Sequence, residues 1–238
     1  KFMNYMDDKI FREEYYELLK IYKSKNLTLT EVKVKKMIKK YPKNGILLNM
    51  LGSVYFEQEK TNEAIKSYTK VIKFKPDFIN ARYNLATSFH KIRKFDEAVF
   101  HYKEILKLDP KLINVYIALG NTLKFLGKTK ESIECFKKAL IFKPDLLSAH
   151  ISLGVSLQEN KNYKEAIFHL EKSPLQTSKA RILECLYAIN KLDEYKKLLK
   201  EISKNQPKNI RAGTISTFVS QQLNFVEVDI VVWLRNYF

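Results

Sequence analysis

The sequence predicts an all-α protein, a solenoid built from antiparallel helix pairs. Prolines recur every 34 residues, at Pro42, Pro76, Pro110 and Pro144. Each follows an amphipathic stretch that ends in basic residues, a pattern typical of the C-terminal end of a helix. The chain has only six glycines and six prolines, which favours long helices over a turn-rich β fold. Its hydrophobic content of 45% is sufficient to build a core.

Aligning the intervals on these prolines gives a repeat with fixed small and large positions. Successive repeats begin at Gly45, Ile79, Ile113 and Leu147. Small residues hold position eight (Gly52, Ala86, Gly120, Gly154) and position twenty (Ala64, Ala98, Ser132, Ala166). Two helix backbones can therefore approach to the short end of the usual range of about 8–10 Å. Since one helix pair cannot bury its apolar face alone, each repeat needs its neighbour.

Each interval divides into two helices with a turn near position fifteen. The turn residues are Glu59-Lys60, Arg93-Lys94, Gly127-Lys128 and Lys161-Asn162. Acidic residues open the second helix, as in Asp96-Glu97, where they stabilise the N-terminal end of the helix dipole. We therefore expect three complete repeats, over 45–78, 79–112 and 113–146.

Weaker versions of the pattern flank these repeats. Residues 7–44 form a degenerate N-terminal repeat, whose second helix opens on the capping-box pattern Thr28-Leu29-Thr30-Glu31. Residues 147–175 form a shortened fourth repeat, because Pro207 follows Pro144 by less than two full intervals. A degenerate fifth repeat spans 176–209. Residues 210–238 leave the pattern, and we expect a cap or the start of a further domain.

The small and large positions resemble the tetratricopeptide repeat (TPR). The resemblance is strong over 45–175 and weaker over 7–209. The tryptophan that is usual at position four is replaced by Leu48, Arg82, Tyr116 and His150. The resemblance implies a right-handed superhelix in which the first helix of each pair lines a concave groove. Similar bacterial arrays often stand N-terminal to larger enzymes.

In this family, positions two, five, six, nine and twelve of the repeat face the groove. The resemblance implies a partner-binding groove that includes Asn49, Ser53, Asn80, Tyr83, Asn84, Thr87, Asn114, Asn121 and Lys124. Gln158 holds position twelve of the fourth repeat. An amide both donates and accepts hydrogen bonds, which suits capture of an extended peptide backbone. The alternative is composition, because asparagine occurs 16 times in the chain.

Chaperone-binding members of the family clamp two carboxylates with Lys, Asn and Arg side chains. The corresponding positions hold Asn49, Ser53, Asn84, Asn114 and Ala118, of which only Asn84 agrees. We therefore expect no chaperone clamp.

Motifs for catalysis are scarce. The sequence has no Gly-rich phosphate loop, nucleophile elbow or zinc-binding helix motif. His150 is expected to pack in the core, and His169-Leu170-Glu171 imitates an iron triad without a second histidine to complete it. Cys135 and Cys185 lack metal-ligand spacing and are expected to be buried thiols. We expect no cofactor, no metal and no catalysis by this chain alone.

The basic charge leaves several partners open. A formal net charge of +17 suits an acidic protein, a nucleic acid or an anionic membrane surface. However, 37 lysines against six arginines indicate solvated helix faces and genome composition, since nucleic-acid sites favour Arg. Nucleic-acid binding is therefore disfavoured but stays open. No apolar run reaches the length of a membrane helix, so we expect a cytoplasmic protein without a membrane partner.

Three functional hypotheses follow. The favoured one is a protein-interaction scaffold that binds a peptide or protein in the groove. The second is the substrate-docking N-terminal arm of a larger enzyme, a glycosyltransferase or a 2-oxoglutarate oxygenase-like protein. The third is a basic solenoid that binds RNA. The identity of the partner, the pathway and the oligomeric state are left open.

Overall fold

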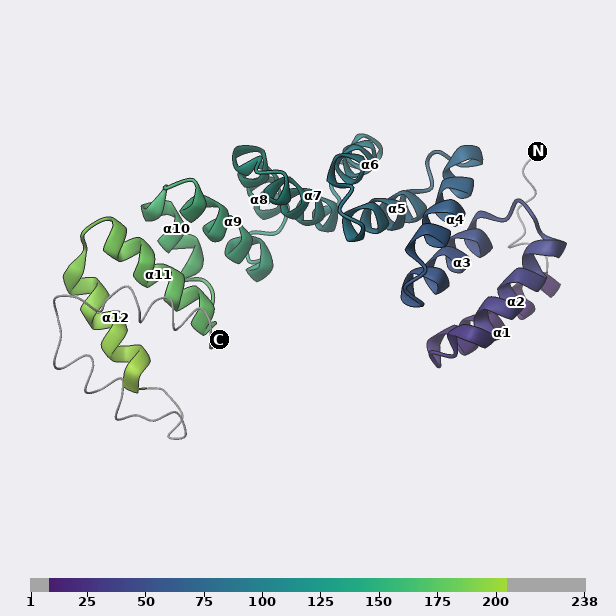
Figure 1. Ribbon diagram of the computed structural model, residues 1–238, viewed down its shortest axis with the longest axis horizontal. Coiled ribbons are helices and arrows are strands. Elements are labelled where there is room, and N and C mark those ends of the chain that lie inside the picture. The colour runs from purple at the N-terminus through teal and green to yellow at the C-terminus, as the bar shows by residue number, and fades with distance from the viewer. Residues whose placement is uncertain (1–8, 205–238) are drawn as a thin grey trace. The chain divides into compact units, whose positions relative to one another are not determined.

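The computed structural model describes residues 9–204, and these residues form α-helices joined by short turns (Figure 1). The helices are α1 Lys9–Lys23, α2 Leu27–Lys40, α3 Gly45–Glu57, α4 Thr61–Phe74, α5 Ile79–Lys91, α6 Phe95–Leu108, α7 Ile113–Phe125, α8 Thr129–Phe142, α9 Leu147–Glu159, α10 Tyr163–Leu170, α11 Gln176–Ala188 and α12 Leu192–Lys204. The described residues contain no strand, so the fold is all-α, as predicted. The tail predicted over 210–238 lies outside the described residues.

The helix starts follow the alignment of the repeats. α3, α5, α7 and α9 begin at Gly45, Ile79, Ile113 and Leu147, the residues at which the alignment begins each repeat. α10 has only eight residues against fourteen in α4, α6 and α8, so the fourth helix pair is short.

The predicted capping box at Thr28 is wrong. α2 begins at Leu27, two residues before the start that a cap at Thr28 implies, and its N-cap is Asn26, whose Oδ1 accepts a hydrogen bond from the Leu29 amide at 3.1 Å. The Thr30 hydroxyl donates to the Asn26 carbonyl at 2.7 Å instead of capping. Asparagine is as good an N-cap as serine or threonine, so the first polar residue after the turn takes the role.

The turn inside each helix pair contains one residue in the left-handed region. These residues are Lys25, Glu59, Arg93, Gly127, Lys161 and Asn190, with φ between 58° and 70°. Only one of them is glycine, although glycine adopts this conformation at the lowest cost. The position-fifteen turns predicted from the sequence are therefore present with a common backbone geometry.

The chain divides into two compact units, Lys1–Thr122 and Leu123–Phe238, which we call the first and second units. In the first unit, each helix from α1 to α6 packs on the next, and its core contains Phe11, Leu47, Tyr68 and Leu85. In the second unit, each helix from α8 to α12 packs on the next around Leu170, Leu183 and Tyr195.

The two helices of a pair come closest where the small residue at position eight meets the large residue at position twenty-four, which is Tyr68, Tyr102, Phe136 or Leu170. A Cβ built on Gly52 would lie 2.7 Å from Cδ1 of Tyr68, and one built on Gly154 would lie 2.7 Å from Cγ of Leu170. Tyr68 and Leu170 are both buried, so neither side chain has room to retreat. The glycines are therefore required by packing and not by their backbone angles.

Position four carries a hydrogen-bond donor in three consecutive repeats. Arg82 Nη2 donates to the Pro76 carbonyl at 2.7 Å, and the Tyr116 hydroxyl donates to the Pro110 carbonyl at 3.1 Å. His150 Nε2 lies 2.8 Å from the Pro144 carbonyl and must donate, because a carbonyl only accepts. Each side chain thus satisfies the carbonyl of the proline that ends the preceding repeat.

Candidate partner-binding surface

The predicted groove residues lie on three first helices, α3, α5 and α7. All except Lys124 belong to the first unit. Asn80, Asn114 and Asn121 are exposed, whereas Asn49, Ser53, Tyr83, Asn84 and Thr87 are half-buried. The exposed amides make no hydrogen bond to another described residue, so they are available to a partner.

Two asparagines of neighbouring repeats are joined directly. Asn84 Nδ2 donates to Asn49 Oδ1 at 3.1 Å, which fixes the orientation of both amides. Within the described part of the chain, this bond leaves the side-chain Nδ2 of Asn49 and the side-chain Oδ1 of Asn84 without partners. The pair therefore presents a donor and an acceptor side by side, which is the complement of a peptide unit.

Ser53 and Thr87, both predicted groove residues, bond to the other helix of their own pair. The Tyr68 hydroxyl donates to Ser53 Oγ at 3.2 Å. Thr87 Oγ1 donates to the Tyr83 carbonyl at 3.0 Å, so it accepts from the Tyr102 hydroxyl at 3.2 Å. Burial raises the pKa of Tyr68 and of Tyr102 to about 12, which keeps both phenols protonated as donors. Each of these two hydrogen bonds therefore joins the two helices of its own pair.

Position twelve holds Phe56 in the first of the aligned repeats and the polar residues His90, Lys124 and Gln158 in the next three. In the first unit, His90 Nδ1 lies 2.9 Å from Thr122 Oγ1, whose own proton goes to the Ala118 carbonyl, so His90 donates. Burial lowers the pKa of His90, which favours the neutral imidazole. In the second unit, Lys124 forms an ion pair with Glu159 at 3.1 Å. The charge of this predicted groove cation is therefore already compensated.

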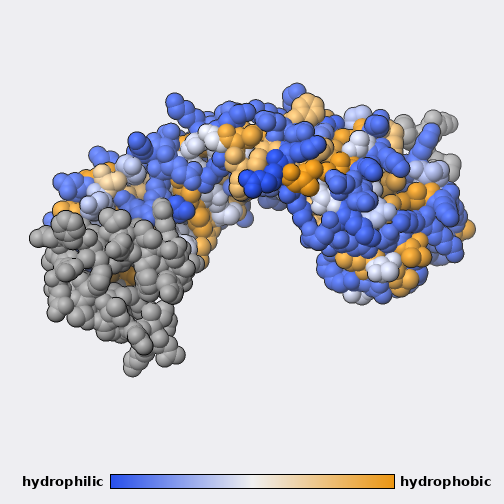
Figure 2. All heavy atoms as spheres, in the orientation of Figure 1, coloured by the Kyte–Doolittle hydropathy of each residue, from blue (hydrophilic) through white to orange (hydrophobic). Residues whose placement is uncertain are grey.

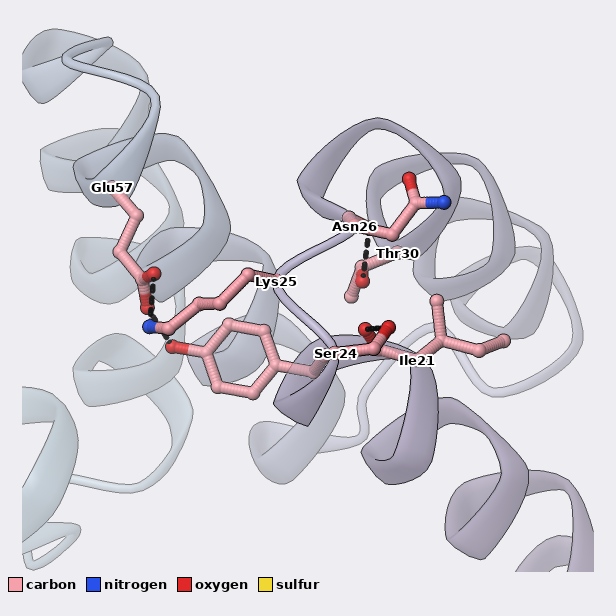
Figure 3. Close-up of polar contacts among 7 residues, drawn as sticks. Ile21, Ser24, Lys25, Asn26, Thr30 and Glu57 are labelled. Atoms are coloured by element: carbon pink, nitrogen blue, oxygen red, sulfur yellow. Dashed lines mark hydrogen bonds and ion pairs between the residues drawn. The ribbon is translucent and has the colours of Figure 1, made fainter.

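A charged cluster that the sequence did not indicate joins the first helix pair to α3 (Figure 3). Lys25, in the left-handed turn after α1, pairs with Glu57 Oε2 at 2.8 Å, and the Tyr22 hydroxyl donates to Glu57 Oε1. The hydrogen bond from Lys25, followed by that from Tyr22, lowers the pKa of Glu57. Because the partners are more than thirty residues apart, spacing rules within one helix give no signal for this contact.

The surface charge is mostly solvated. Hydrophilic side chains cover most of the face of the described residues drawn in Figure 2. Many lysines form exposed pairs within one helix, such as Lys20 with Glu17 and Lys107 with Glu104, and such pairs contribute little to stability. No helix among residues 9–204 is both long and apolar enough to cross a membrane.

Two of the four histidines and both cysteines pack inside the second unit. His150 and His169 are buried with their Nδ1 atoms 2.8 Å apart, and Cys135 and Cys185 are buried thiols. His150 is thus a packed core residue, as expected. Within the described residues, no group of three or more His, Cys, Asp or Glu side chains is placed to hold a metal ion.

Family models match the central repeats. A model described as TPR repeat matches residues 52–92, and two described as tetratricopeptide repeat match residues 79–112 and 113–145. Repeats of this kind indicate a scaffold for protein–protein interaction.

Curated relatives match over short stretches. The chain is 34% identical over 85 residues to the uncharacterized protein ycf37 of Cyanophora paradoxa, a match that covers 36% of this chain and 42% of that protein. It is 38% identical over 47 residues to the peroxisomal targeting signal receptor of Saccharomyces cerevisiae and 40% identical over 47 residues to that of Candida albicans. These matches cover 20% of this chain and 8% of each receptor, so the chain spans less than a tenth of the receptors' length.

Solved structures share the fold at low identity. PilF of Pseudomonas aeruginosa superposes with a TM-score of 0.68 at 14% identity, covering 87% of this chain and 96% of its own. A MamA structure superposes with a TM-score of 0.61 at 22% identity, covering 74% of this chain and 96% of its own. The fold, the recurring small positions and the three family matches agree, and the chain is a tetratricopeptide-repeat protein.

Proposed function

We propose that this chain is a protein-interaction scaffold whose first unit binds an extended peptide segment of its partner. The observation that carries the proposal is the Asn84–Asn49 pair, which leaves one amide donor and one carbonyl acceptor adjacent on neighbouring repeats. The exposed amides of Asn80 and Asn114 add two further groups of the same kind on α5 and α7.

Amide side chains favour a partner recognised through its backbone. Each asparagine offers both a donor and an acceptor, the two groups that an extended peptide presents at every residue. Contacts to the backbone make few demands on the partner's side chains, so we expect tolerance of sequence in the bound segment. The matched curated receptors recognise, by their name, a targeting signal, which supports a peptide as the ligand.

The test is selection from a display library of random peptides, followed by affinity measurement on the double variant Asn80→Ala/Asn114→Ala. We expect the wild-type chain to select peptides and the double variant to bind them about tenfold more weakly. The reason is that each lost hydrogen bond contributes about 0.5–1.5 kcal/mol. Both side chains are exposed, so circular dichroism and the thermal midpoint should not change.

The matched control is Asn62→Ala/Asn160→Ala, which removes two exposed amides from positions outside the predicted groove. It should bind the selected peptides as the wild type does. Equal affinity of the wild type and the Asn80/Asn114 variant would show that the binding surface lies elsewhere.

A further inference from the structure

Two histidines of the second unit make a short contact that joins the two helices of the fourth repeat. His150, on α9, and His169, on α10, are both buried, and their Nδ1 atoms lie 2.8 Å apart. At this separation the two nitrogens form a hydrogen bond, so one proton lies between them. That proton belongs to one of the two rings, and the bond made by the other nitrogen of His150 decides which.

The Pro144 carbonyl determines which ring donates. His150 Nε2 lies 2.8 Å from that oxygen and carries a proton, because a carbonyl only accepts. In a neutral His150, Nδ1 is therefore bare and accepts. His169 then donates from Nδ1, so its neutral ring carries no proton on Nε2. The neutral pair thus has one permitted arrangement of its protons.

This arrangement limits how many protons the pair can bind. A first added proton can occupy Nε2 of His169, and one proton still lies between the two Nδ1 atoms. A second added proton would place an N–H group on both Nδ1 atoms, so that two donors of two charged rings would face each other across 2.8 Å. Each histidine of an unfolded chain binds a proton below a pH of about 6.5, so the folded pair holds at least one proton fewer.

The charged groups around the pair disfavour its protonation on balance. Lys137 of α8 forms an ion pair with Glu165 of α10 at 3.1 Å, and Lys172 follows the end of α10. Burial first, and then the charge of His150, lower the pKa of His169. Glu165 opposes this shift in part, and Lys137 and Lys172 add to it.

Helix α11 packs on both α9 and α10, but its charged side chains have partners elsewhere. Arg181 and Glu184 bond to Gln158 near the end of α9, and Lys179 pairs with a glutamate of α12 at 2.8 Å. Gln158 follows His150 by eight residues, which is about 12 Å along a helix. The charges of α11 therefore lie away from the histidine contact.

α10 depends on this contact more than a longer helix would. It has eight residues, against fourteen in α8, and its buried residues are Ala166, His169 and Leu170. One of the three side chains that α10 buries is therefore a titratable imidazole. Loss of its hydrogen bond removes a large part of what holds this short helix in place.

We propose that the His150–His169 contact is a pH-sensitive latch of the fourth helix pair. At neutral pH the latch holds α10 on α9, and uptake of the second proton breaks it, so that α10 separates locally from α9. Its contribution to stability is complete above a pH of about 6.5 and is lost as the pH falls below that value. The inference is independent of the proposed function, because the Asn84–Asn49 pair belongs to the first unit.

The direct test observes the protons on the imidazole nitrogens. Long-range ¹H–¹⁵N NMR spectra of the full chain, labelled with ¹⁵N-histidine, distinguish the two neutral tautomers from the charged ring between pH 8 and pH 5. At pH 8 we expect Nε2–H on His150 and Nδ1–H on His169, as the two hydrogen bonds require. The opposite tautomers, or two charged rings while the amide signals of α10 keep their positions, would overturn the latch.

Hydrogen exchange of the α10 amides, corrected for the intrinsic rate at each pH, measures the opening itself. Between pH 7 and pH 5 we expect the equilibrium constant for opening to rise about 25-fold, the effect of excluding one proton from a histidine whose unperturbed pKa is about 6.5. A rise of less than about tenfold would mean that the closed pair takes up both protons, against the latch.

One variant isolates the pair, and one serves as its matched control. In His169→Asn, the amide can donate to His150 Nδ1 at neutral pH and can turn to accept from it once His150 is charged. The opening of α10 should then depend on pH much less than in the wild type. His101→Gln removes a histidine from the first unit and should leave the pH dependence of α10 unchanged.

Equal pH dependence of α10 in the wild type and in His169→Asn would assign the effect to other groups and contradict the latch. If the asparagine variant does not fold, the tautomers and the proton uptake of the wild-type pair still decide.

Discussion

At position four, where this repeat usually carries tryptophan, three polar side chains make the same hydrogen bond. Arg82, Tyr116 and His150 differ in size and charge, yet each donates to the carbonyl of the preceding repeat-ending proline. That carbonyl follows the end of a helix and would otherwise lack an internal partner. Leu48, at the same position, has no donor to offer. In three of the four aligned repeats, position four therefore supplies the same hydrogen bond from a different residue type.

In two of the repeats, the side chain at position four also contacts a histidine of the second helix. His101 Nδ1 lies 3.5 Å from Arg82 Nη1, and His169 Nδ1 lies 2.8 Å from His150 Nδ1. Burial first, and then the charge of Arg82, lower the pKa of His101 to about 4, against the opposing effect of Glu104 and Glu97. This imidazole is therefore neutral in the folded protein at neutral pH.

We predict that the first unit loses stability as the pH falls from about 6.5 to about 4. In this window the unfolded His101 binds a proton that the folded His101 does not, so protons favour the unfolded state. Urea denaturation of the wild type and of His101→Gln, measured at pH 7 and pH 5, checks it. The variant should show a smaller drop in midpoint between the two values. An equal drop in both proteins would exclude His101 as the source.

At the scale of elements, each turn inside a helix pair contains one residue in the left-handed conformation. In five of these turns that residue is lysine, glutamate, arginine or asparagine. A residue with a side chain costs about 1 kcal/mol in this conformation, whereas glycine does not. The turn is imposed by the packing of the two helices that it joins, and the local preference of the residue is overridden.

We predict that Gly127→Ala destabilises the second unit by about 1 kcal/mol. Gly127 has a φ of 70°, and a Cβ built on it meets nothing within 4 Å, so the loss is conformational and not steric. Chemical denaturation measures the change. In the reciprocal variant Lys161→Gly, the relief of the left-handed conformation offsets the greater freedom of the unfolded chain, and stability should change by less than about 0.5 kcal/mol. A neutral effect of Gly127→Ala would contradict this account of the turn.

At the scale of the molecule, each helix pair makes most of its contacts with its neighbours. In the first unit these contacts run from α1 to α6, and in the second unit from α8 to α12. The stability of such an array is the sum of repeat and nearest-neighbour terms, so local damage should spread only over neighbouring repeats. The division of the chain into two compact units fits this expectation.

We predict that Gly52→Ala and Gly154→Ala lower protection from hydrogen exchange in different units. The added methyl group clashes with buried Tyr68 in the first case and with buried Leu170 in the second, at a cost of about 1–3 kcal/mol each. Hydrogen exchange followed by mass spectrometry should locate the loss in the first and second unit, respectively. Gly45→Ala is the control, because its Cβ would lie 3.4 Å from Val71 Cγ1, near ordinary contact. Equal loss across both units in both variants would indicate one cooperative domain.

The sequence by itself determined the all-α repeat fold and the starts of the central helix pairs. This was possible because a small residue, such as Gly52, and a large residue, such as Tyr68, recur at the same positions of each repeat. Contacts between neighbouring repeats follow from that period. Only the tertiary structure decided which polar groups remain for a partner. The Ser53 hydroxyl, for example, accepts a hydrogen bond from Tyr68 on the other helix of its pair. Arg181 donates a hydrogen bond to Gln158 beyond the shortened fourth repeat, where the 34-residue period no longer predicts which residues lie side by side.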